Sequence, residues 1–535
     1  MSRGAASQNL QRRLREPPEI AAAGLASLLL PRPSVLARVT AAAIHGIEAV
    51  PVSVEVDVSN GLPGLTMVGL PDATVRESRD RVRAAIRNSG FPFPGARITV
   101  SLAPTDLRKA GAAFDLPIAL GVLSASGVLP FRQPRPMTVV GGLSLDGSIP
   151  ALRGVLPVAI SARTAHAGGL MCPAANAVEA SIVEGLSVFP VASLLDAARV
   201  SCQERPQAAR VTPPARVPDR PADDLADVRG QLLGRRALEI AAAGGHHLLF
   251  NGPPGAGKTM LARRLPGLLP DLEFEEALTV TTIHSVAGLL PADAGLLWRR
   301  PFRAPHHTCS EVALVGGGAI PRPGELSLAH GGVLFLDELP EFSRRVLETL
   351  RQPLEQGVVH IARAARSTTF PARVMLIGAM NPCPCGFHGT PGQRCLCPAG
   401  AIERYVRRLS GPLRDRFDLA VDISPVPWRE ARDPAPAEPS AAVRSRVVAA
   451  RSRQLAARRQ LNATLDGRPL RAACQLEDRA AETLLGRGVE RLRLSARAIT
   501  RVLRVARTIA DLEGAGLLGR RHVAEALQFR LSADR

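Results

Sequence analysis

Lysine, aromatic residues and long apolar runs are scarce in this chain of 535 residues. Only two of its 67 lysine and arginine residues are lysines, and aromatic residues make up 3% of the chain, with a single tyrosine. So few aromatic rings disfavour base stacking as a main mode of nucleic-acid binding. No apolar run approaches the roughly 20 residues that a membrane-spanning helix needs, so we expect no membrane partner.

One of the two lysines, Lys258, lies in the glycine-rich octet Gly252-Pro253-Pro254-Gly255-Ala256-Gly257-Lys258-Thr259. The octet fits Gly-x-x-x-x-Gly-Lys-Ser/Thr, in which backbone N–H groups surround phosphates, the lysine contacts the β and γ oxygens and the hydroxyl binds Mg²⁺. An apolar run at 247–250 precedes it and a helical pattern at 260–265 follows it, as expected for a strand, a phosphate-binding loop and a helix. The sequence therefore predicts a site for ATP and Mg²⁺.

Acidic and polar residues end two later apolar runs. The run 332–336 leads to Asp337 and Glu338, and the run 374–379 leads to Asn381. Downstream of a phosphate-binding loop, the first carboxylate orients Mg²⁺ and the second polarises the attacking water. Thr259 and Asp337 are therefore the predicted magnesium ligands, and Asn381 is placed to hold the water or the γ-phosphate.

The net charge of +19 predicts attraction to a polyanion, most simply nucleic acid. The alternative is an arginine-rich coding bias without any such partner. Because aromatic residues are few, arginine contacts with phosphates are the expected mode of binding. Arg416 and Arg497 stand at positions expected for phosphate sensing in the ATP site, although a surface salt bridge would explain either residue taken singly.

Four of the eight cysteines fall in one short window, as Cys383, Cys385, Cys395 and Cys397. Four thiolates close a tetrahedral structural zinc site, and a cytoplasmic setting disfavours disulfides. The Cys-x-Cys spacing is tighter than that of the usual zinc knuckle, and His388 is an alternative ligand. The window predicts a structural Zn²⁺, with a loop of free thiols as the alternative.

The first 37 residues hold an apolar stretch, 20–30, behind Arg12, Arg13 and Arg15. This order is typical of a secretory signal peptide. An ATP site and clustered Cys-x-Cys pairs, however, belong in a reducing compartment that contains ATP. We therefore interpret residues 1–37 as a disordered extension or a misassigned start, and we expect a cytoplasmic protein.

Composition and periodicity divide the rest of the chain. Short β-like runs alternate with Gly-Pro turns over residues 38–203, which predicts an α+β domain. A stretch rich in Pro and Arg at 204–224 predicts a linker, and the ATP-binding core then occupies 225–425. A second Pro-rich hinge, 426–439, leads to residues 440–535, which have helical periodicity.

Domain order and motifs resemble the ComM branch, or YifB type, of the magnesium-chelatase-like AAA+ ATPases. The resemblance runs from about residue 35 to the end and is carried by Gly61-Leu62-Pro63-Gly64, Arg303-Ala304-Pro305-His306-His307, Asn381-Pro382-Cys383-Pro384-Cys385-Gly386 and residues 68–72, 114–120, 227–231 and 323–330. It implies a multidomain α/β fold with a Lon-proteolytic-domain-like N-terminal α+β domain, a P-loop AAA+ core and a C-terminal helical lid.

The resemblance also implies a function. It implies a ring-shaped ATPase that is expected to be a hexamer. Such an ATPase would be similar to DNA helicases that extend branched strands during natural transformation. On that analogy Asn381 is sensor 1, Arg416 is the finger that reaches a neighbour's ATP, and Arg497 is sensor 2 in the lid. Residues 227–231 would lie near the adenine, and the expected partners are branched or single-stranded DNA and further copies of the chain.

Two segments are candidates for loops that reach DNA in the pore of such a ring. Residues 358–363 and 367–370 predict a hairpin that carries Arg363 and Arg366, and the glycine-rich loop 316–322 carries Arg322. These arginines would hold the DNA backbone without reading bases. The alternative is an ordinary exposed turn.

A further basic helix face is predicted in the C-terminal part. Arg444, Arg451 and Arg458 recur every seven residues, in a stretch from Glu438 to Asp466 without an intervening acid. The face is interpreted either as a second DNA surface or as a solvated helix face.

The N-terminal domain does not carry protease chemistry. Residues 108–113 resemble the nucleophile loop of Lon-type proteases, but Ala113 stands where such a protease needs serine. After Lys109 the next lysine is Lys258, so a Ser–Lys dyad cannot be built within the domain. Lys109 is expected to pair with Asp106 or Asp115, or to contact DNA.

Three classes of function remain. A DNA-translocating motor, acting in natural transformation or recombination, predicts an ATPase that DNA stimulates and salt inhibits. A chelatase-like remodelling ATPase predicts a protein or metal-insertion partner, and a scaffold predicts dispensable ATP motifs. The Lon-like domain and the basic charge favour the motor.

Overall fold

The computed structural model describes residues 36–69, 72–105, 109, 111–130, 136–204, 206–209, 211, 223–291, 293–318, 320–363, 366–390, 393–431 and 437–531. These residues form two compact units, one of residues up to 215 with 284–295 and one of residues 216–283 with 296–535. The predicted extension and most of the predicted linker lie outside the described residues, as do residues 432–436 of the predicted hinge, so those domain boundaries stay predictions. None of the described helices is both long enough and apolar enough to cross a membrane.

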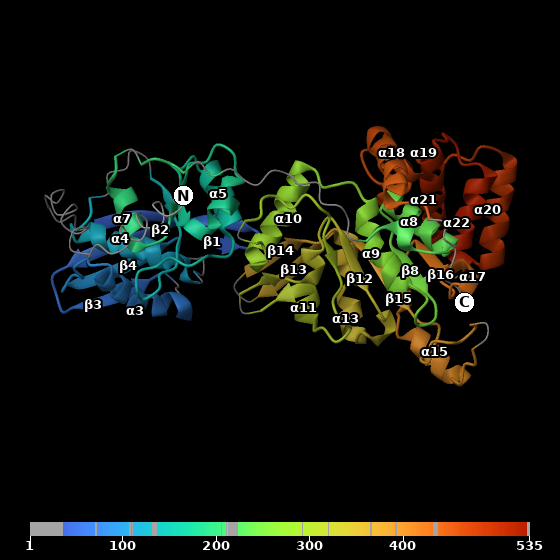
Figure 1. The fold of residues 1–535 in the computed structure, drawn as a ribbon, viewed down its shortest axis with the longest axis horizontal. Coiled ribbons are helices and arrows are strands. Elements are labelled where there is room, and N and C mark those ends of the chain that lie inside the picture. Colours follow the sequence, from blue (N-terminus) through green and yellow to red (C-terminus); the bar gives the residue numbers. More distant parts are fainter. Residues whose placement is uncertain are drawn as a thin grey trace, which may run out of the picture. The chain divides into compact units, whose positions relative to one another are not determined.

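The first unit is built on a mixed seven-stranded sheet in the order β3-β4-β2-β1-β5-β6-β7 (Figure 1). β1 and β2 form an antiparallel hairpin, β4 adds antiparallel to β2, and the other neighbours are parallel. Val52, Val54 and Val56 of β2 are fully buried, as their alternation with polar residues predicts. The strands are β1 Leu36–His45, β2 Glu48–Ser59, β3 Gly64–Val68, β4 Arg97–Ala103, β5 Thr138–Val139, β6 Leu170–Pro173 and β7 Val188–Val191.

The helices of the first unit differ in how they are buried. α4 is apolar all round and almost wholly buried, whereas α3 is amphipathic and begins at Asp72, whose carboxylate accepts a hydrogen bond from Val75 N at 2.8 Å. The helices are α3 Ala73–Asn88, α4 Asp115–Ala125, α5 Val155–Thr164, α6 Ala177–Ser181 and α7 Leu194–Cys202.

Lys109 is fully buried in this unit, and its ammonium group donates to the carbonyl of Pro104. Asp115, one of its expected partners, accepts hydrogen bonds from Ser78 and Arg81. Asp106, the other, lies outside the described residues. The prediction that Lys109 contacts DNA is wrong, because its side chain is inaccessible.

The second unit contains a five-stranded, all-parallel sheet in the order β16-β8-β15-β12-β9. Its central strands are continuous apolar runs, as expected of a sheet that is covered on both faces. The strands are β8 Leu248–Asn251, β9 Phe302–Arg303, β12 Val333–Leu336, β15 Met375–Met380 and β16 Leu419–Asp422, and two hairpins pair β10 Gly316–Gly317 with β11 Arg322–Pro323 and β13 Val358–Arg363 with β14 Arg366–Pro371.

Helices surround this sheet, and those after residue 440 gather at one end of the unit (Figure 1). Leu238, Val447 and Ile509, from α8, α18 and α21, belong to one buried cluster, so the C-terminal helices share the core of the sheet domain. The helices are α8 Leu232–Gly244, α9 Lys258–Leu268, α10 Phe274–Ala287, α11 Glu311–Val315, α12 Glu325–Leu328, α13 Arg344–Thr349, α14 Arg351–Gln356, α15 Ala399–Arg407, α16 Gly411–Arg414, α17 Trp428–Ala431, α18 Ser440–Arg458, α19 Gly467–Ala473, α20 Arg479–Leu492, α21 Ala496–Glu513 and α22 Arg520–Leu531.

The basic face predicted on α18 points into the protein. Arg451 is 7% exposed, and its Nε donates to the carbonyl of Ala242 at 2.8 Å. Arg444 pairs with Asp271 at 2.7 Å, and Arg458 pairs with Asp511. Both interpretations are therefore wrong for Arg451 and Arg458, which bind acceptors inside the unit, whereas Arg444 forms a part-exposed ion pair at the surface.

We expect Arg451→Ala to lower the free energy of unfolding by about 2–4 kcal/mol, since it removes a buried side chain and its hydrogen bond. Denaturant unfolding of the full chain measures the change. Ser452→Ala, at the neighbouring exposed position, is the control and should stay within about 0.5 kcal/mol of the parent. A loss of DNA affinity without a loss of stability would contradict the internal role of Arg451.

Candidate nucleotide site and cysteine cluster

The parallel sheet brings three predicted segments to one edge. β15 lies between β8 and β12, so the carboxyl ends of these strands lie side by side. The phosphate-binding loop follows β8, Asp337 and Glu338 follow β12, and Asn381 follows β15. A cavity of about 430 Å³ opens there, lined by residues 254–260, Asp337, Glu338, Met380 and Asn381.

The loop between β8 and α9 has the backbone that an anion site needs. Gly255 and Gly257 have φ angles of 75° and 92°, which glycine adopts without strain. α9 begins at Lys258, so its first N–H groups and the positive end of its dipole lie at the cavity. A helix N-terminus after a glycine-rich turn is a ready-made site for phosphate.

Lys258 is buried, and its ammonium group is held by three oxygens. Nζ donates to the carbonyls of Gly252 at 2.5 Å and Pro253 at 2.9 Å, and to Oδ1 of Asn381 at 2.9 Å. Burial lowers the pKa of Lys258, and the nearby carboxylates of Asp337 and Glu338 oppose that shift. These contacts place the predicted sensor residue Asn381 directly against the lysine.

The predicted magnesium ligands also meet. The hydroxyl of Thr259 donates to Oδ2 of Asp337 at 2.7 Å, and the backbone N–H of Glu338 donates to the other carboxylate oxygen at 2.9 Å. A hydroxyl and a carboxylate are oxygen ligands of the kind that Mg²⁺ prefers. Glu338 has a left-handed backbone with a φ of 50°, and its side chain is 53% exposed.

His307 is a residue of the site to which the sequence assigned no role. Its Nδ1 lies 3.2 Å from a carboxylate oxygen of Glu338, and its ring packs edge-on against Phe342. The position of His307 follows from the topology of the sheet. β9 is parallel to β12, so the residues after both strands, including His307 and Glu338, lie at the same edge.

The two predicted sensing arginines lie outside this cavity lining. Arg416 forms an ion pair with Glu355 of α14. Arg497 is exposed in the first turn of α21, and no side-chain partner for it is found in the described parts of the chain. A single chain therefore leaves both guanidinium groups away from the phosphate-binding loop.

Gln231, in the segment expected near the adenine, bridges two elements of the site. Its amide donates to the carbonyl of Ala256 in the phosphate-binding loop at 3.0 Å and to that of Ser424, after β16, at 2.6 Å. The segment 227–231 therefore borders the loop, as its predicted role requires.

The segments proposed for DNA form two hairpins that contact each other. β10 lies against β13. Gly316 of β10 is so close to Ile361 of β13 that a Cβ added to Gly316 would lie 3.3 Å from the Ile361 side chain. Arg322, in β11, is exposed. Arg363 ends β13 and Arg366 begins β14, and the two residues pair at the hairpin tip, but their side chains lie outside the described residues.

The four clustered cysteines converge. Sγ of Cys383 lies 3.3 Å from that of Cys385 and 3.7 Å from that of Cys395, and the four sulfur atoms lie within 4.8 Å of one another. Tetrahedral Zn²⁺ with bonds of about 2.3 Å requires sulfurs about 3.8 Å apart, so this donor set fits the ion. A hydrogen bond from the backbone N–H of Phe387 is the main cause that lowers the pKa of Cys385 to about 6.

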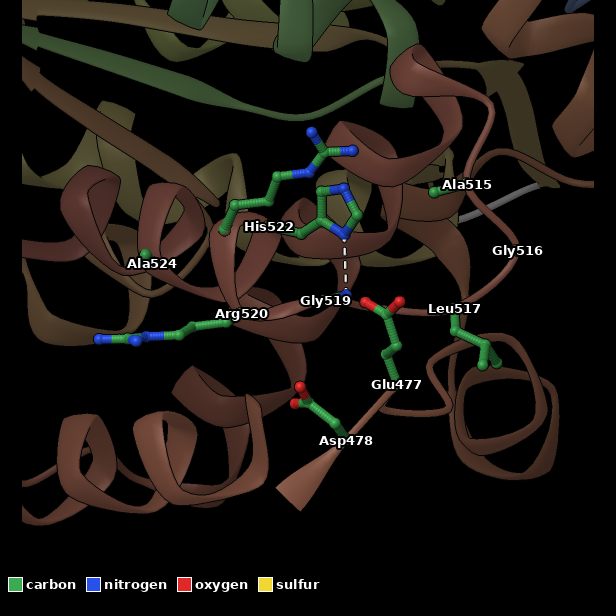
Figure 2. Close-up of a pocket in the computed structure, with 10 residues that line it drawn as sticks. Glu477, Asp478, Ala515, Gly516, Leu517, Gly519, Arg520, His522 and Ala524 are labelled. Atoms are coloured by element: carbon green, nitrogen blue, oxygen red, sulfur yellow. Dashed lines mark hydrogen bonds between the residues drawn. The ribbon is translucent and has the colours of Figure 1, made fainter. Parts of the chain in front are cut away.

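A second cavity, of about 710 Å³, lies in the helical part of the unit (Figure 2). Its polar groups already stabilise helix ends: Nδ1 of His522 accepts from Gly519 N at 2.9 Å, and Asp478 caps the first turn of α20. None of the predicted site residues lines it. The lining residues drawn in Figure 2 include Glu477, Asp478, Leu517, Gly519, Arg520 and His522.

Three family profiles match the chain in order. They are described as subunit ChlI of Mg-chelatase, over residues 54–176, magnesium chelatase subunit ChlI, over residues 224–431, and the C-terminal part of that subunit, over residues 437–530.

Individual relatives match over most of the length. The chain is 47% identical over 489 residues to the uncharacterized protein YifB of Escherichia coli, which covers 91% of this chain and 95% of YifB. It is 45% identical over 502 residues to the competence protein ComM of Haemophilus influenzae, with 92% and 97% covered. A more distant match is the magnesium-chelatase 38 kDa subunit of Rhodobacter capsulatus, 27% identical over 354 residues, with 59% of this chain and 89% of that subunit covered.

We expect His307→Ala to lower the rate of ATP turnover by about 10- to 100-fold while leaving nucleotide affinity unchanged, because the imidazole contacts the carboxylate of Glu338, the residue predicted to polarise the attacking water. Steady-state turnover and binding of a fluorescent ATP analogue separate the two effects. The control is His306→Ala, since the ring of His306 bonds to Thr308 rather than to Glu338. Equal turnover in the two variants would exclude a positioning role for His307.

Proposed function

Because the chain belongs to the YifB and ComM family of magnesium-chelatase-like AAA+ ATPases, we propose that it is a ring-shaped, ATP-driven motor that moves branched or single-stranded DNA. The observation that carries the proposal is the presence, in one unit, of the pocket around Lys258 and of two contacting hairpins that bear arginines. The name of the competence protein ComM supports a role in natural transformation or in DNA recombination.

In the proposed reaction, Lys258 and the backbone N–H groups of residues 255–259 bind the phosphates of ATP. Thr259 and Asp337 would hold Mg²⁺, which would supply charge neutralisation for the transferred phosphoryl group. Glu338 polarises the attacking water, and Asn381, beside the ammonium group of Lys258, holds that water or the γ-phosphate. The hydrogen bond from Lys258 Nζ to Asn381 Oδ1 supports this assignment, since it places both side chains at the same side of the pocket.

DNA is the proposed substrate of the hairpins. Arg322 is exposed on β11, and the tip of the β13–β14 hairpin carries Arg363 and Arg366. Guanidinium groups bind phosphates without reading the bases, so binding would be independent of sequence and would weaken steeply as salt increases.

The proposed ring, a hexamer by analogy with the family, supplies what one chain lacks. Arg416 would leave Glu355 and enter the ATP pocket of the next subunit, and Arg497 would sense the nucleotide from the helical lid. The position of both residues outside the pocket of their own chain supports a division of the site between subunits. An arginine supplied in trans accelerates phosphoryl transfer by about 10³–10⁵-fold.

We propose two further features. A structural Zn²⁺ is held by Cys383, Cys385, Cys395 and Cys397, which the sulfur geometry supports. The first unit is a Lon-like domain without protease chemistry, since Ala113 replaces the serine of that fold's nucleophile loop.

A remodelling ATPase acting on a protein or metal-insertion partner is the second candidate. The magnesium-chelatase profiles, which match all three parts of the chain, favour it. The two candidates differ in their activator, because DNA stimulates only the motor.

We expect forked DNA to raise the rate of Mg²⁺-dependent ATP hydrolysis at least about threefold, with the stimulation lost as salt displaces the arginine–phosphate contacts. Phosphate release with and without the fork, across a salt titration, measures this. Glu338→Gln should still bind ATP but not cleave it, and serves as the catalytic control. Hydrolysis that ignores DNA at every salt concentration would favour the remodelling ATPase.

We expect Arg416→Ala and Lys258→Ala to be nearly inactive alone and to recover partial turnover when they are assembled together, because intact Lys258 pockets then meet intact Arg416 side chains. Native mass measurements establish that mixed rings form. Arg414→Ala, two residues before the proposed finger, is the matched control and should retain most of the turnover. Mixed rings without recovered activity would exclude action of Arg416 in trans.

A further inference from the structure

The segment that carries the cysteine cluster is continuous with the ATP pocket. Asn381, whose side chain contacts Lys258, lies two residues before Cys383, a fully buried member of the cluster. The backbone N–H of His388 donates to the sulfur of Cys383 at 3.3 Å. Only Pro382 separates Asn381 from Cys383 along the chain.

The same turn also contacts the phosphate-binding loop. Gly386 has a φ of 88°, and a Cβ added there would lie 2.4 Å from Cδ of Pro254. A side chain at position 386 thus has no room unless the loop moves. The cluster therefore borders the pocket at two places: through Asn381 along the chain and through Gly386 across space.

The segment between β15 and α15 is irregular. Between Met380 and α15 the described residues include no helix or strand, and their backbone hydrogen bonds are short-range turns such as Gly386 N to Cys383 O at 3.0 Å. An irregular loop of this kind is ordered when a metal closes it, because the binding free energy of the metal is also folding free energy.

We infer that the cysteine cluster is part of the ATP site, and that binding of Zn²⁺ to its four sulfurs holds Asn381 against Lys258 and Gly386 against Pro254. Nucleotide affinity then depends on the metal, although the metal touches no nucleotide. This inference rests on the proposed ATP pocket and on the proposed zinc site, and it adds their coupling.

The first experiment varies the metal. The full chain is assayed as purified without a metal-affinity tag, after removal of metal by a chelator with thiols kept reduced, and after return of Zn²⁺ or Cd²⁺. Zinc content and affinity for a fluorescent ATP analogue are measured in each state. We expect removal of the metal to weaken binding of the analogue about tenfold or more, as loss of groups that support a metal site does. Return of either metal should restore the affinity.

The outcomes separate the three proposals. One zinc per chain, with unchanged analogue affinity after its removal, would overturn the coupling while leaving the zinc site and the pocket intact. Absence of zinc together with tight binding of the analogue would overturn the zinc site and the coupling. Absence of binding in every metal state would overturn the ATP pocket and, with it, the inference.

The second experiment tests the contact itself with two glycines of one loop. Gly386 and Gly389 both have a positive φ, of 88° and 72°. A Cβ added at Gly386 would collide with Pro254 of the phosphate-binding loop, whereas a Cβ added at Gly389 would meet nothing within 4 Å. We expect Gly386→Ala to weaken the analogue about tenfold more than Gly389→Ala does, with one zinc retained in both variants. Equal affinities would overturn the coupling.

Cysteine variants complete the test. Cys397→Ser should lose zinc and analogue affinity together, and Cys397→His should keep both, because histidine can replace one thiolate in a zinc site. Cys202→Ser, in the first unit, controls for loss of a thiol elsewhere. Analogue affinity that follows protein stability rather than zinc content across these variants would contradict the inference.

Discussion

The parallel alignment of β8, β15 and β12 is the constraint on which the candidate site depends. The carboxyl ends of parallel strands lie at one edge of a sheet, so residues up to 129 positions apart in the chain, such as Asn251 and Met380, become neighbours there. Lys258 and Asn381, and Thr259 and Asp337, are in hydrogen-bond contact for this reason. The same geometry brings His307 to Glu338, since β9 extends the sheet beside β12.

The positive charge of the chain is only in part a surface property. Of the described arginines, Arg264, Arg451, Arg501, Arg507 and Arg530 are buried. Several bind acceptors far along the chain: Arg501 pairs with Asp415 at 2.9 Å, and Nε of Arg451 donates to the carbonyl of Ala242 at 2.8 Å. A guanidinium group keeps its charge when buried and offers five N–H donors, which suits it to join helices to the sheet. The net charge therefore overstates the number of arginines that are free to meet a polyanion.

The segment around Arg416 illustrates how closely the helical part and the sheet part are connected. Arg501 of α21 binds the carboxylate of Asp415, and Arg530 of α22 donates to the carbonyl of Phe417 at 3.2 Å. His246 lies 3.0 Å from Asp418 and 2.8 Å from Thr508 of α21. The proposed finger thus stands on a backbone that the C-terminal helices hold on both sides, and a movement of those helices would move it.

The sequence by itself determined the family, the parallel α/β core and the helical C-terminal part, and it predicted residues that the structure brings to one cavity. It could do so because the glycine-rich octet and the acids at Asp337 and Glu338 have local signatures that depend on chain order alone. It did not determine the role of His307, the burial of Lys109 or the direction in which the arginines of α18 point. Those depend on which elements pack against each other: a period of seven places Arg444, Arg451 and Arg458 on one face, but only the packing of α18 on α8 decides that this face is inside. The likeness of the first unit to Lon stays a prediction, and the contact of Gly386 with Pro254 had no sequence signal, because it joins two loops across space and depends on a fraction of an ångström of room.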